Sequence, residues 1–137
     1  MKIADEMEVA EARRIRMPAG LLGFESIKEF DLISKPDEDP FMRMQSPGKP
    51  SLSFVLISPF VVAPEYRPDI PTADAESLEL KTPDDALVLN IVSIKNGSAT
   101  VNLKGPIIVN CRTRQARQVV LNNAASYSVQ HPLPIES

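Results

Sequence analysis

The sequence contains few of the residues that enzymes and metal proteins use for chemistry. It has one cysteine, Cys111, and one histidine, His131, among 137 residues. A single cysteine excludes an intramolecular disulfide and a cysteine-rich zinc site, and a single histidine leaves no cluster of metal ligands. The spacing of Gly20 and Gly23 matches neither the Walker nor the dinucleotide-binding pattern. The sequence therefore predicts no catalytic residue, no metal site and no cofactor.

Two residue pairs could still support catalysis, but a structural role is the simpler interpretation of both. Cys111 and His131 could act as nucleophile and base, yet nothing in the sequence orients them toward each other. We expect Cys111 to be a structural residue in a β-strand. Asp84 and Asp85 could bind a metal or act as acid and base, but after Thr82-Pro83 we expect them to cap a turn.

Strongly charged and long apolar segments are also missing. The formal net charge is −3, so no strongly basic surface suggests a nucleic-acid-binding protein. Arg112, Arg114 and Arg117 lack the interleaved aromatic residues that stack on bases, and a solvated sheet edge explains them more simply. No apolar run resembles a signal peptide or a membrane span. We expect a cytoplasmic protein, and a small β-barrel that binds nucleic acid stays open as the alternative.

The residues that are present indicate a small all-β domain. Hydrophobic residues make up 43% of the chain, which is enough for a core, and residues 1–137 suit one domain. The 13 prolines are scattered, so they divide the chain into many short elements. Tryptophan is absent, and aromatic residues make up only 5%.

The segment from Pro83 to Asn110 has the clearest pattern. Asn96-Gly97 lies between two apolar runs, which predicts a hairpin with a type I′ turn. This turn places Ile94 opposite Ala99 and Val92 opposite Val101, so one face of the hairpin is more apolar than the other.

Other short runs with turn signals between them are expected to form strands. With the hairpin, the expected strands are residues 7–17, 30–32, 41–45, 52–57, 87–94, 99–103, 107–109 and 115–121. Residues 60–62 could continue the fourth of these, and the tail from residue 127 is expected to be extended. One short helix is expected near residues 72–80, with Thr72 as its N-cap. Eight or nine short, mostly antiparallel strands predict a small single-domain β-barrel or pseudo-barrel.

Two glycines three residues apart enclose the dipeptide Leu21-Leu22. Phe24 follows directly, so the pattern predicts a turn whose hydrophobic tip is tucked into the core. The alternative interpretation is that this tip is the lip of a binding site.

Several of these segments, taken in order, resemble the flagellar assembly factor W (FliW) family of bacteria. The matching segments are Gly20–Phe24, Phe41–Ser46, Pro83–Val92, Ala99–Asn110, Thr113-Arg114, Gln118–Leu121, Tyr127 and His131–Leu133. The sequence departs from the family pattern at Gly105, where alanine is expected, and at Gln130, where a basic residue is expected.

The resemblance implies a non-enzymatic protein that switches between two partners. Such proteins bind flagellin in a chaperone-like way. They also bind the translational regulator known as the carbon storage regulator (CsrA) and stop it from repressing flagellin messenger RNA. We expect a monomer, because no heptad pattern or long bare strand is evident.

Two sets of residues are candidates for partner binding. Phe24, Phe41 and Tyr66 lie in or beside segments bounded by glycine or proline, so they could be exposed and form an apolar groove for flagellin. The alternative is that all three belong to the core. The second set is acidic and lies in the expected helix, where it could meet the basic surface of the regulator. It consists of Asp74, Glu76 and Glu79.

Overall fold

Antiparallel strands are the main regular structure of the described residues, and the helices are few and short, which confirms the predicted all-β class. The computed structural model describes residues 11–48 and 52–134. The strands of this described part are β1 (Glu11–Arg16), β2 (Glu29–Ser34), β3 (Phe41–Gln45), β4 (Ser53–Ile57), β5 (Ala86–Lys95), β6 (Ser98–Val101), β7 (Ile107–Asn110), β8 (Ala116–Gln118) and β9 (His131–Leu133). The helices are α2 (Pro59–Val62) and α3 (Thr72–Ser77), with 3-10 turns at Pro36–Glu38, Pro83–Asp85 and Ala124–Ser126.

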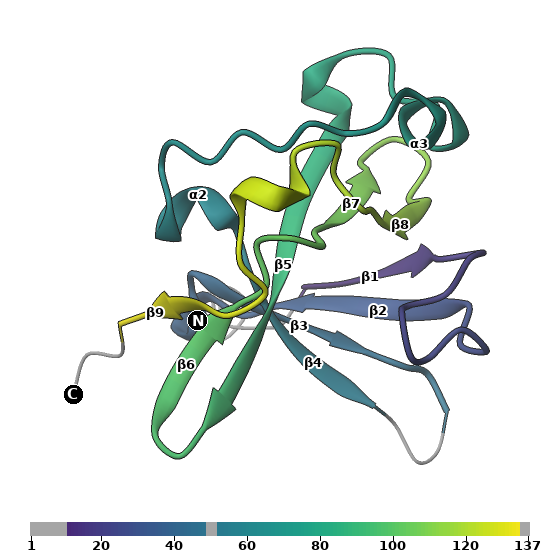
Figure 1. Ribbon diagram of the computed structural model, residues 1–137. Coiled ribbons are helices and arrows are strands. Elements are labelled where there is room, and N and C mark those ends of the chain that lie inside the picture. Colours follow the sequence, from purple (N-terminus) through teal and green to yellow (C-terminus); the bar gives the residue numbers. More distant parts are fainter. Residues whose placement is uncertain (1–10, 49–51, 135–137) are drawn as a thin grey trace.

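The sheet branches at β5, its longest strand. The main hydrogen-bonded order is β1-β2-β3-β4-β5-β6-β9 (Figure 1). Residues 86–89 of β5 pair with β7, which also pairs with β8, whereas residues 90–95 pair with β4 and β6. The strands do not close into a barrel. A single parallel bridge between Arg16 and Gln115 brings the end of β1 to the start of β8, so the fold is a pseudo-barrel.

The hairpin of β5 and β6 has the predicted turn and register. Asn96 and Gly97 have φ angles of 52° and 79°, the positive values that a type I′ turn requires. Ile94 lies opposite Ala99, and Val92 lies opposite Val101. The prediction is therefore confirmed at the level of individual residue pairs.

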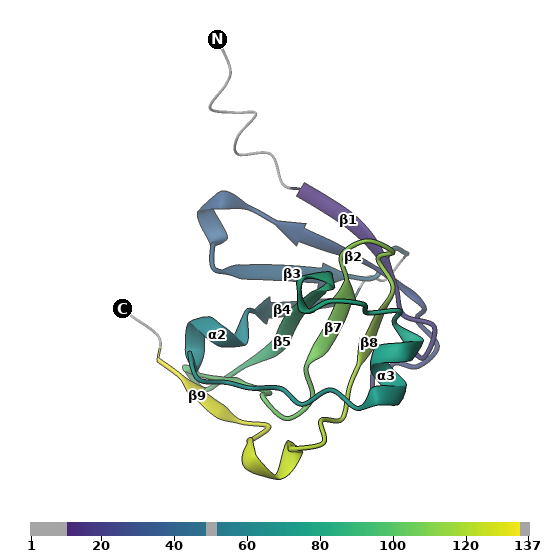
Figure 2. The same ribbon diagram turned by 90° about the horizontal axis from the view of Figure 1, so that it is seen from above.

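The buried apolar side chains of the described residues form two clusters. The first lies among β1–β5, β7 and β8, and includes Ile15, Met17, Leu21, Phe30, Leu32, Met44, Leu56, Leu89, Ile107, Val109 and Ala116. The second lies beneath the connection that runs from α2 to α3, and includes Ile57, Tyr66, Leu78, Val92, Ala99, Val101, Leu103, Ile108, Val119 and Leu121. Seen from above, α2 and α3 lie at opposite ends of this connection (Figure 2).

The segment after β4 is a helix, which corrects the expectation that residues 60–62 continue the strand. Pro59 is the first residue of α2, and the N–H of Ala63 donates to the Pro59 carbonyl at 2.8 Å. Proline suits this first position because its φ angle is already helical and its missing N–H would have had no partner there. The sequence pattern was thus wrong to leave α3 as the only helix.

Several element boundaries also differ from the prediction. The helix near residues 72–80 ends at Ser77, and its N-cap is Pro71, not Thr72. The strand expected over residues 115–121 ends at Gln118, because the N–H of Val119 donates instead to the Pro106 carbonyl at 2.9 Å. The first strand runs over Glu11–Arg16, and the part predicted over residues 7–10 lies outside the described residues. The tail contributes β9, which pairs with β6.

The glycine-bounded turn is only partly tucked into the core. Leu21 is buried, but Leu22 is 80% exposed, so the prediction is wrong for Leu22. The N–H of Leu22 donates to the side-chain oxygen of Gln118 at 3.0 Å, which holds the tip against β8. Gly20 and Gly23 have φ angles of 72° and 90°. The turn therefore presents Leu22 to solvent on a well-supported backbone.

Replacing Gly20 by alanine should destabilise the fold more than the same change at Gly23. A Cβ atom at Gly20 would lie 2.5 Å from the backbone of Glu25, whereas one at Gly23 would meet nothing within 4 Å. Gly23→Ala is the matched control, since it adds only the strain of a positive φ angle, about 1 kcal/mol. Gly20→Ala must also move the backbone, which should cost at least about 1 kcal/mol more. Urea denaturation measures both, and equal losses would contradict the expected clash.

Candidate functional site

An apolar groove of about 710 Å³ crosses the sheet beside α2. Val55 of β4 and Val92 of β5 pair across their strands and belong to its floor. Paired residues project from the same face of a sheet, so these side chains form a continuous surface. Val61 of α2 and Leu133 of β9 line the groove as well. The groove thus joins six elements from separate parts of the sequence, since β3 and β6 also contribute to it.

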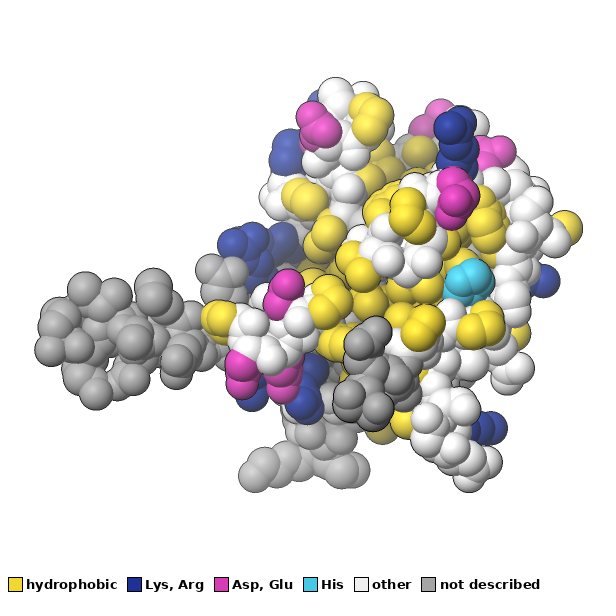
Figure 3. Space-filling model, turned by 90° about the vertical axis from the view of Figure 1, so that its left-hand side faces the viewer, with side chains coloured by type: hydrophobic (Ala, Val, Ile, Leu, Met, Phe, Trp, Pro, Cys, Tyr) yellow, Lys and Arg dark blue, Asp and Glu magenta, His cyan; other side chains and the backbone are white. Residues whose placement is uncertain are grey.

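Large apolar side chains of the groove remain in contact with solvent. Ile94 is 64% exposed and Val61 is 57% exposed. Figure 3 faces this side of the molecule and shows hydrophobic side chains gathered around the single histidine, with acidic side chains nearby. Apolar patches with a polar rim often mark interaction sites on soluble proteins. This arrangement makes the groove the candidate functional site.

An acidic turn forms one rim of the groove. Glu38 accepts hydrogen bonds from the Arg43 guanidinium at 2.8 and 3.0 Å, and these bonds lower the pKa of its carboxyl. Asp37 and Asp39 are exposed beside this pair and also line the groove. Because Arg43 is already held by Glu38, the rim keeps a negative character.

Phe41 is the one aromatic candidate that lies at the groove. It is partly buried in β3, pairs with Ile57 and belongs to the lining. Phe24 is 37% exposed, but its ring packs edge-on against Phe54 at 5.4 Å between centroids. Phe54 packs against the first core cluster. The structure therefore does not bring Phe24 and Phe41 together in one surface, and a binding role for either stays a prediction.

Tyr66 is a core residue, so the core alternative is confirmed for it and the hypothesis that it is exposed is wrong. It is only 3% exposed, and its hydroxyl donates to the Leu103 carbonyl at 2.7 Å. Its ring packs edge-on against Phe60 and Tyr127. Burial raises the pKa of the Tyr66 hydroxyl.

The irregular segment around Tyr66 is held on the second cluster by hydrogen bonds. The N–H of Arg67 donates to the Tyr127 hydroxyl at 3.0 Å, and the N–H of Asp69 donates to the Asn123 side-chain oxygen at 3.1 Å. Prolines on either side therefore did not indicate exposure here.

The acidic candidates of α3 have different surroundings. Asp74 forms an ion pair with Arg117 of β8 at 2.8 Å, so its charge is already compensated. Glu76 and Glu79 are exposed. Glu79 follows the helix with a φ angle of 56°, and its carbonyl accepts a hydrogen bond from Arg112 at 2.9 Å. Glu76 and Glu79 are thus the exposed members of this set, and their role in binding stays a prediction.

An ion pair anchors the segment that follows α3. Asp85 accepts hydrogen bonds from the Arg112 guanidinium at 3.1 and 3.4 Å and from the N–H groups of Lys81 and Thr82. These bonds, led by the one from Arg112, lower the pKa of Asp85 to about 2. Asp85 thus caps the turn before β5, as the sequence predicted for this position.

Cys111 and His131 belong to unrelated parts of the fold. Cys111 is exposed in the turn after β7, which corrects the expectation that it lies in a strand. His131 is in β9 and pairs with Val101. Across residues 11–48 and 52–134, no group of His, Cys, Asp and Glu side chains could hold a metal ion. No helix in this described part is long and apolar enough to cross a membrane.

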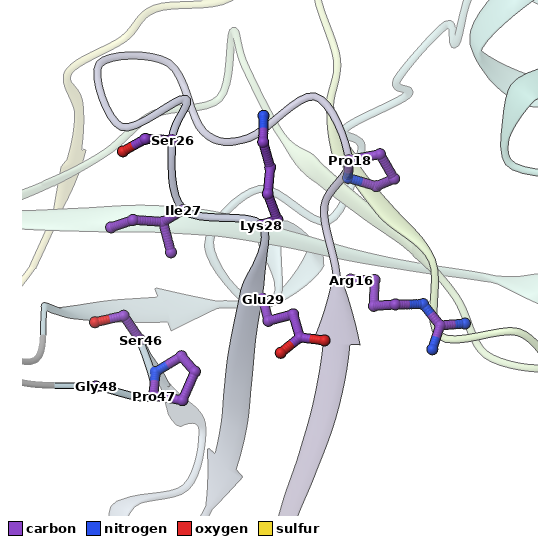
Figure 4. A pocket seen from close by; sticks show the side chains of 9 residues that line it. All are labelled: Arg16, Pro18, Ser26, Ile27, Lys28, Glu29, Ser46, Pro47 and Gly48. Carbon is purple, nitrogen blue, oxygen red and sulfur yellow. The ribbon is translucent and has the colours of Figure 1, made fainter.

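A second hollow, of about 680 Å³, lies where β1, β2 and the end of β3 meet. Figure 4 shows its side chains, and those of Arg16 and Lys28 do not converge on one point. Glu29, which also lines it, is held by Arg14 at 3.1 Å. A hollow whose polar groups point apart offers a ligand no defined site, so we do not treat it as a functional site.

Comparison with known proteins relates the whole of this fold to one family. The family model described as FliW protein matches residues 1–133. The flagellar assembly factor FliW of Clostridioides difficile is 34% identical over 122 residues, which cover 88% of this chain and 93% of that protein. This chain belongs to the FliW family.

Other FliW proteins agree in sequence and in structure. The flagellar assembly factor FliW of Bacillus subtilis is 33% identical, with 99% of this chain and 96% of that protein covered. A crystal structure of the flagellar assembly factor FliW has a TM-score of 0.78 and 33% identity, and the match covers 88% of this chain and 86% of that one. The resemblance seen in the sequence is therefore confirmed.

Most groove residues of this FliW-family chain were missed in the sequence. The hairpin register did place Ile94 opposite Ala99 on the more apolar face, and this was the available signal. The sequence did not indicate Val61 as a groove residue, because residues 60–62 were interpreted as the continuation of a strand. The tail residue Leu133 reaches the groove only through the pairing of β9 with β6.

Replacing Asp85 by asparagine should destabilise the fold in a pH-dependent way. The pKa of this carboxyl is about 2 in the folded protein and has an ordinary value of 3.8. A lowered pKa contributes stability above 3.8, and this contribution is lost as the pH falls toward 2. The difference in urea midpoint between the parent and Asp85→Asn should therefore shrink over this range.

The control for this experiment is the neighbouring carboxyl. Asp84 is exposed, so Asp84→Asn should leave the midpoint nearly unchanged at neutral pH. A difference for Asp85→Asn that is equally large at pH 7 and at pH 2 would show that the ion pair is not its cause.

Proposed function

We propose that this chain is a non-enzymatic partner-switch protein of flagellar assembly. It binds flagellin in a chaperone-like way, and it binds CsrA and antagonises it, which relieves repression of flagellin translation. It acts in the cytoplasm and as a monomer. The observation that carries the proposal is the exposed apolar groove with its acidic rim, in a member of a family of flagellar assembly factors.

The groove supports the flagellin part of the proposal. An unassembled subunit exposes apolar side chains that its neighbours cover in the filament, so a chaperone-like protein must offer apolar surface of its own. Ile94 is 64% exposed and Val61 is 57% exposed, so most of each side chain is not used in packing this chain's own core. Phe41, the sequence candidate that lines the groove, belongs to the same surface.

The acidic end of α3 supports the regulator part. An RNA-binding regulator must present basic surface, and an acidic partner associates faster with such a surface. Glu76 and Glu79 are exposed there, whereas Asp74 is engaged by Arg117. Because α2 and α3 lie at opposite ends of the molecule, the two partners would meet different surfaces (Figure 1).

A nucleic-acid-binding module is the second candidate, and the ion pairs of the described residues disfavour it. Arg14, Arg43, Arg112 and Arg117 each hold a carboxylate at 3.1 Å or closer. A guanidinium that is paired in this way must give up its partner before it can neutralise a phosphate.

Mixing the purified proteins tests the proposal. Size-exclusion chromatography should show a complex of this chain with monomeric flagellin and a separate complex with CsrA. Adding flagellin to the CsrA complex should release CsrA, and the released CsrA should again bind flagellin messenger RNA. If this chain binds RNA by itself, the nucleic-acid module replaces the proposal. If it binds neither flagellin nor CsrA, the proposal is wrong.

Reversing one charge at the end of α3 should slow association with CsrA. Glu76→Lys places a cation opposite the basic regulator, so we expect a several-fold lower association rate and a weaker dependence on salt. Glu65→Lys is the matched control, because Glu65 is also exposed but lies in the connection after α2. Stopped-flow kinetics at two salt concentrations measure both variants, and equal rates for them would rule out the α3 surface.

A further inference from the structure

We propose that Asn96-Gly97, at the tip of the β5–β6 hairpin, is a deamidation site at which the chain converts itself into an isoaspartyl form without an enzyme. This inference goes beyond the proposed function and does not depend on it. Three features support it: the chemistry of the dipeptide, the exposure of the turn and the different surroundings of the other asparagines.

The reaction needs only the two residues of the turn and water. The main-chain nitrogen of Gly97 loses its proton and attacks the side-chain Cγ of Asn96, the C–N bond of the amide breaks, and ammonia leaves. The product is a five-membered succinimide, which water opens at one of its two carbonyls. Attack at the side-chain carbonyl gives aspartate, and attack at the main-chain carbonyl gives isoaspartate. Glycine favours ring closure because it has no Cβ to hinder the approach of its nitrogen.

The turn is accessible to water and can open at little cost. Residues 95–98 are all exposed, and the tip of the hairpin projects from the lower end of the molecule (Figure 1). Within the part of the chain that the structure describes, neither the Asn96 amide nor the N–H of Gly97 forms a hydrogen bond. Separating the last pair of the hairpin, Lys95 and Ser98, exposes no buried side chain. Segments with few buried contacts open locally at low free energy.

The closed turn slows the reaction through its backbone geometry. Asn96 has a φ angle of 52°, in the left-handed region, where ψ is also positive. This conformation places the Gly97 nitrogen anti to the Asn96 Cβ about the Cα–C bond, so the ring cannot close until ψ rotates. The type I′ turn must therefore open before Gly97 can attack, and the opening equilibrium controls the rate.

The other asparagines lack this combination of features. The chain has six asparagines, and Asn96 is the one that precedes a glycine. Asn122 is the nearest match because it is also exposed, but its amide donates to the Asp69 carboxylate at 3.2 Å. The side chains of all five others form hydrogen bonds, and these residues are Asn90, Asn102, Asn110, Asn122 and Asn123.

Isoaspartate at position 96 is incompatible with the hairpin turn. The isoaspartyl link runs through Cβ and Cγ, so the main chain gains one carbon atom and the two-residue loop becomes longer than a type I′ turn allows. This turn sets the pairing of Ile94 with Ala99, and both residues line the groove. Ala99 is also part of the second core cluster. The modification should therefore loosen the groove edge and lower the stability of the fold.

Ageing of the full-length protein tests the site. After incubation at mildly alkaline pH, peptide mass spectrometry should find isoaspartate and aspartate at position 96, whereas Asn122, the internal control, should be unchanged. Conversion should be several-fold faster in urea, where the turn is absent, and several-fold slower at mildly acidic pH, where the attacking nitrogen keeps its proton.

Three results would overturn the proposal. An unmodified Asn96 in the folded protein, under conditions that convert the urea-unfolded chain, would mean that the turn does not open. Equal conversion of Asn96 and Asn122 would mean that the structure does not select the site. Equal rates at Asn96 with and without urea would mean that the turn does not control the reaction.

Asn96→Gly tests the structural consequence. Glycine accepts the positive φ angle and has no amide, so the fresh variant should unfold at the same urea concentration as the parent. After the same incubation, the parent should contain a fraction that unfolds at lower urea and grows with its isoaspartate content, whereas the variant should not. An equal loss in both proteins, or no loss in a parent that contains isoaspartate, would show that the modification does not disturb the hairpin.

Discussion

The divided pairing of β5 is the constraint on which the rest of the structure depends. One strand pairs with β7 along its first half and with β4 and β6 along its second half. Asn90 lies at the division and is completely buried, and its amide donates to the Asn102 carbonyl at 2.7 Å. Asn102 in turn accepts hydrogen bonds from the N–H groups of Lys104 and Gly105, which turn the chain toward β7. The side-chain nitrogen of Asn90 is therefore paired inside the core, although its Oδ1 has no hydrogen-bond partner among the described residues, and these bonds hold the branch in place.

The candidate site follows from this branch. Residues 90–95 of β5 and their partner β6 extend away from β7. The side chains of the two core clusters therefore cover only part of the face of the sheet. The helix α2 has four residues and is too short to cover the face that remains. Ile94 and Val61 are left in solvent as a result. The groove is therefore a consequence of sheet topology rather than of any single motif.

Ion pairs determine which parts of the surface keep free charge. Arg14 of β1, Arg43 of β3, Arg117 of β8 and Arg112 of the turn after β7 hold carboxylates, and these pairs include Asp74 and Asp85. Exposed ion pairs add little to stability, but they remove free positive charge from the surface. Exposed acids include Asp37 and Asp39 at the groove rim and Glu76 and Glu79 at the end of α3. Because these regions are at opposite ends of the molecule, exclusion of one partner by the other would require a large partner or a movement of the connection between α2 and α3.

The sequence by itself determined the features that depend on neighbouring residues. Asn96-Gly97 specifies the β5–β6 turn, since few other residues accept positive φ angles, and the turn sets the register of the pairs around it. The ordered set of short motifs was also enough to relate the chain to its family. Alternating apolar runs located most of the strands for the same local reason.

Tertiary structure decided which of the remaining residues became surface. Tyr66 and Leu22 lie in similar irregular segments, yet the first is buried against Phe60 and Tyr127 and the second is held outward by a bond to Gln118. The charge of Asp74 is compensated only because β8 brings Arg117 beside it. The groove needs β3, β4, β5, β6, β9 and α2 together. Such contacts join residues far apart in the chain, and a local sequence pattern does not predict which distant side chain will pack against a given residue.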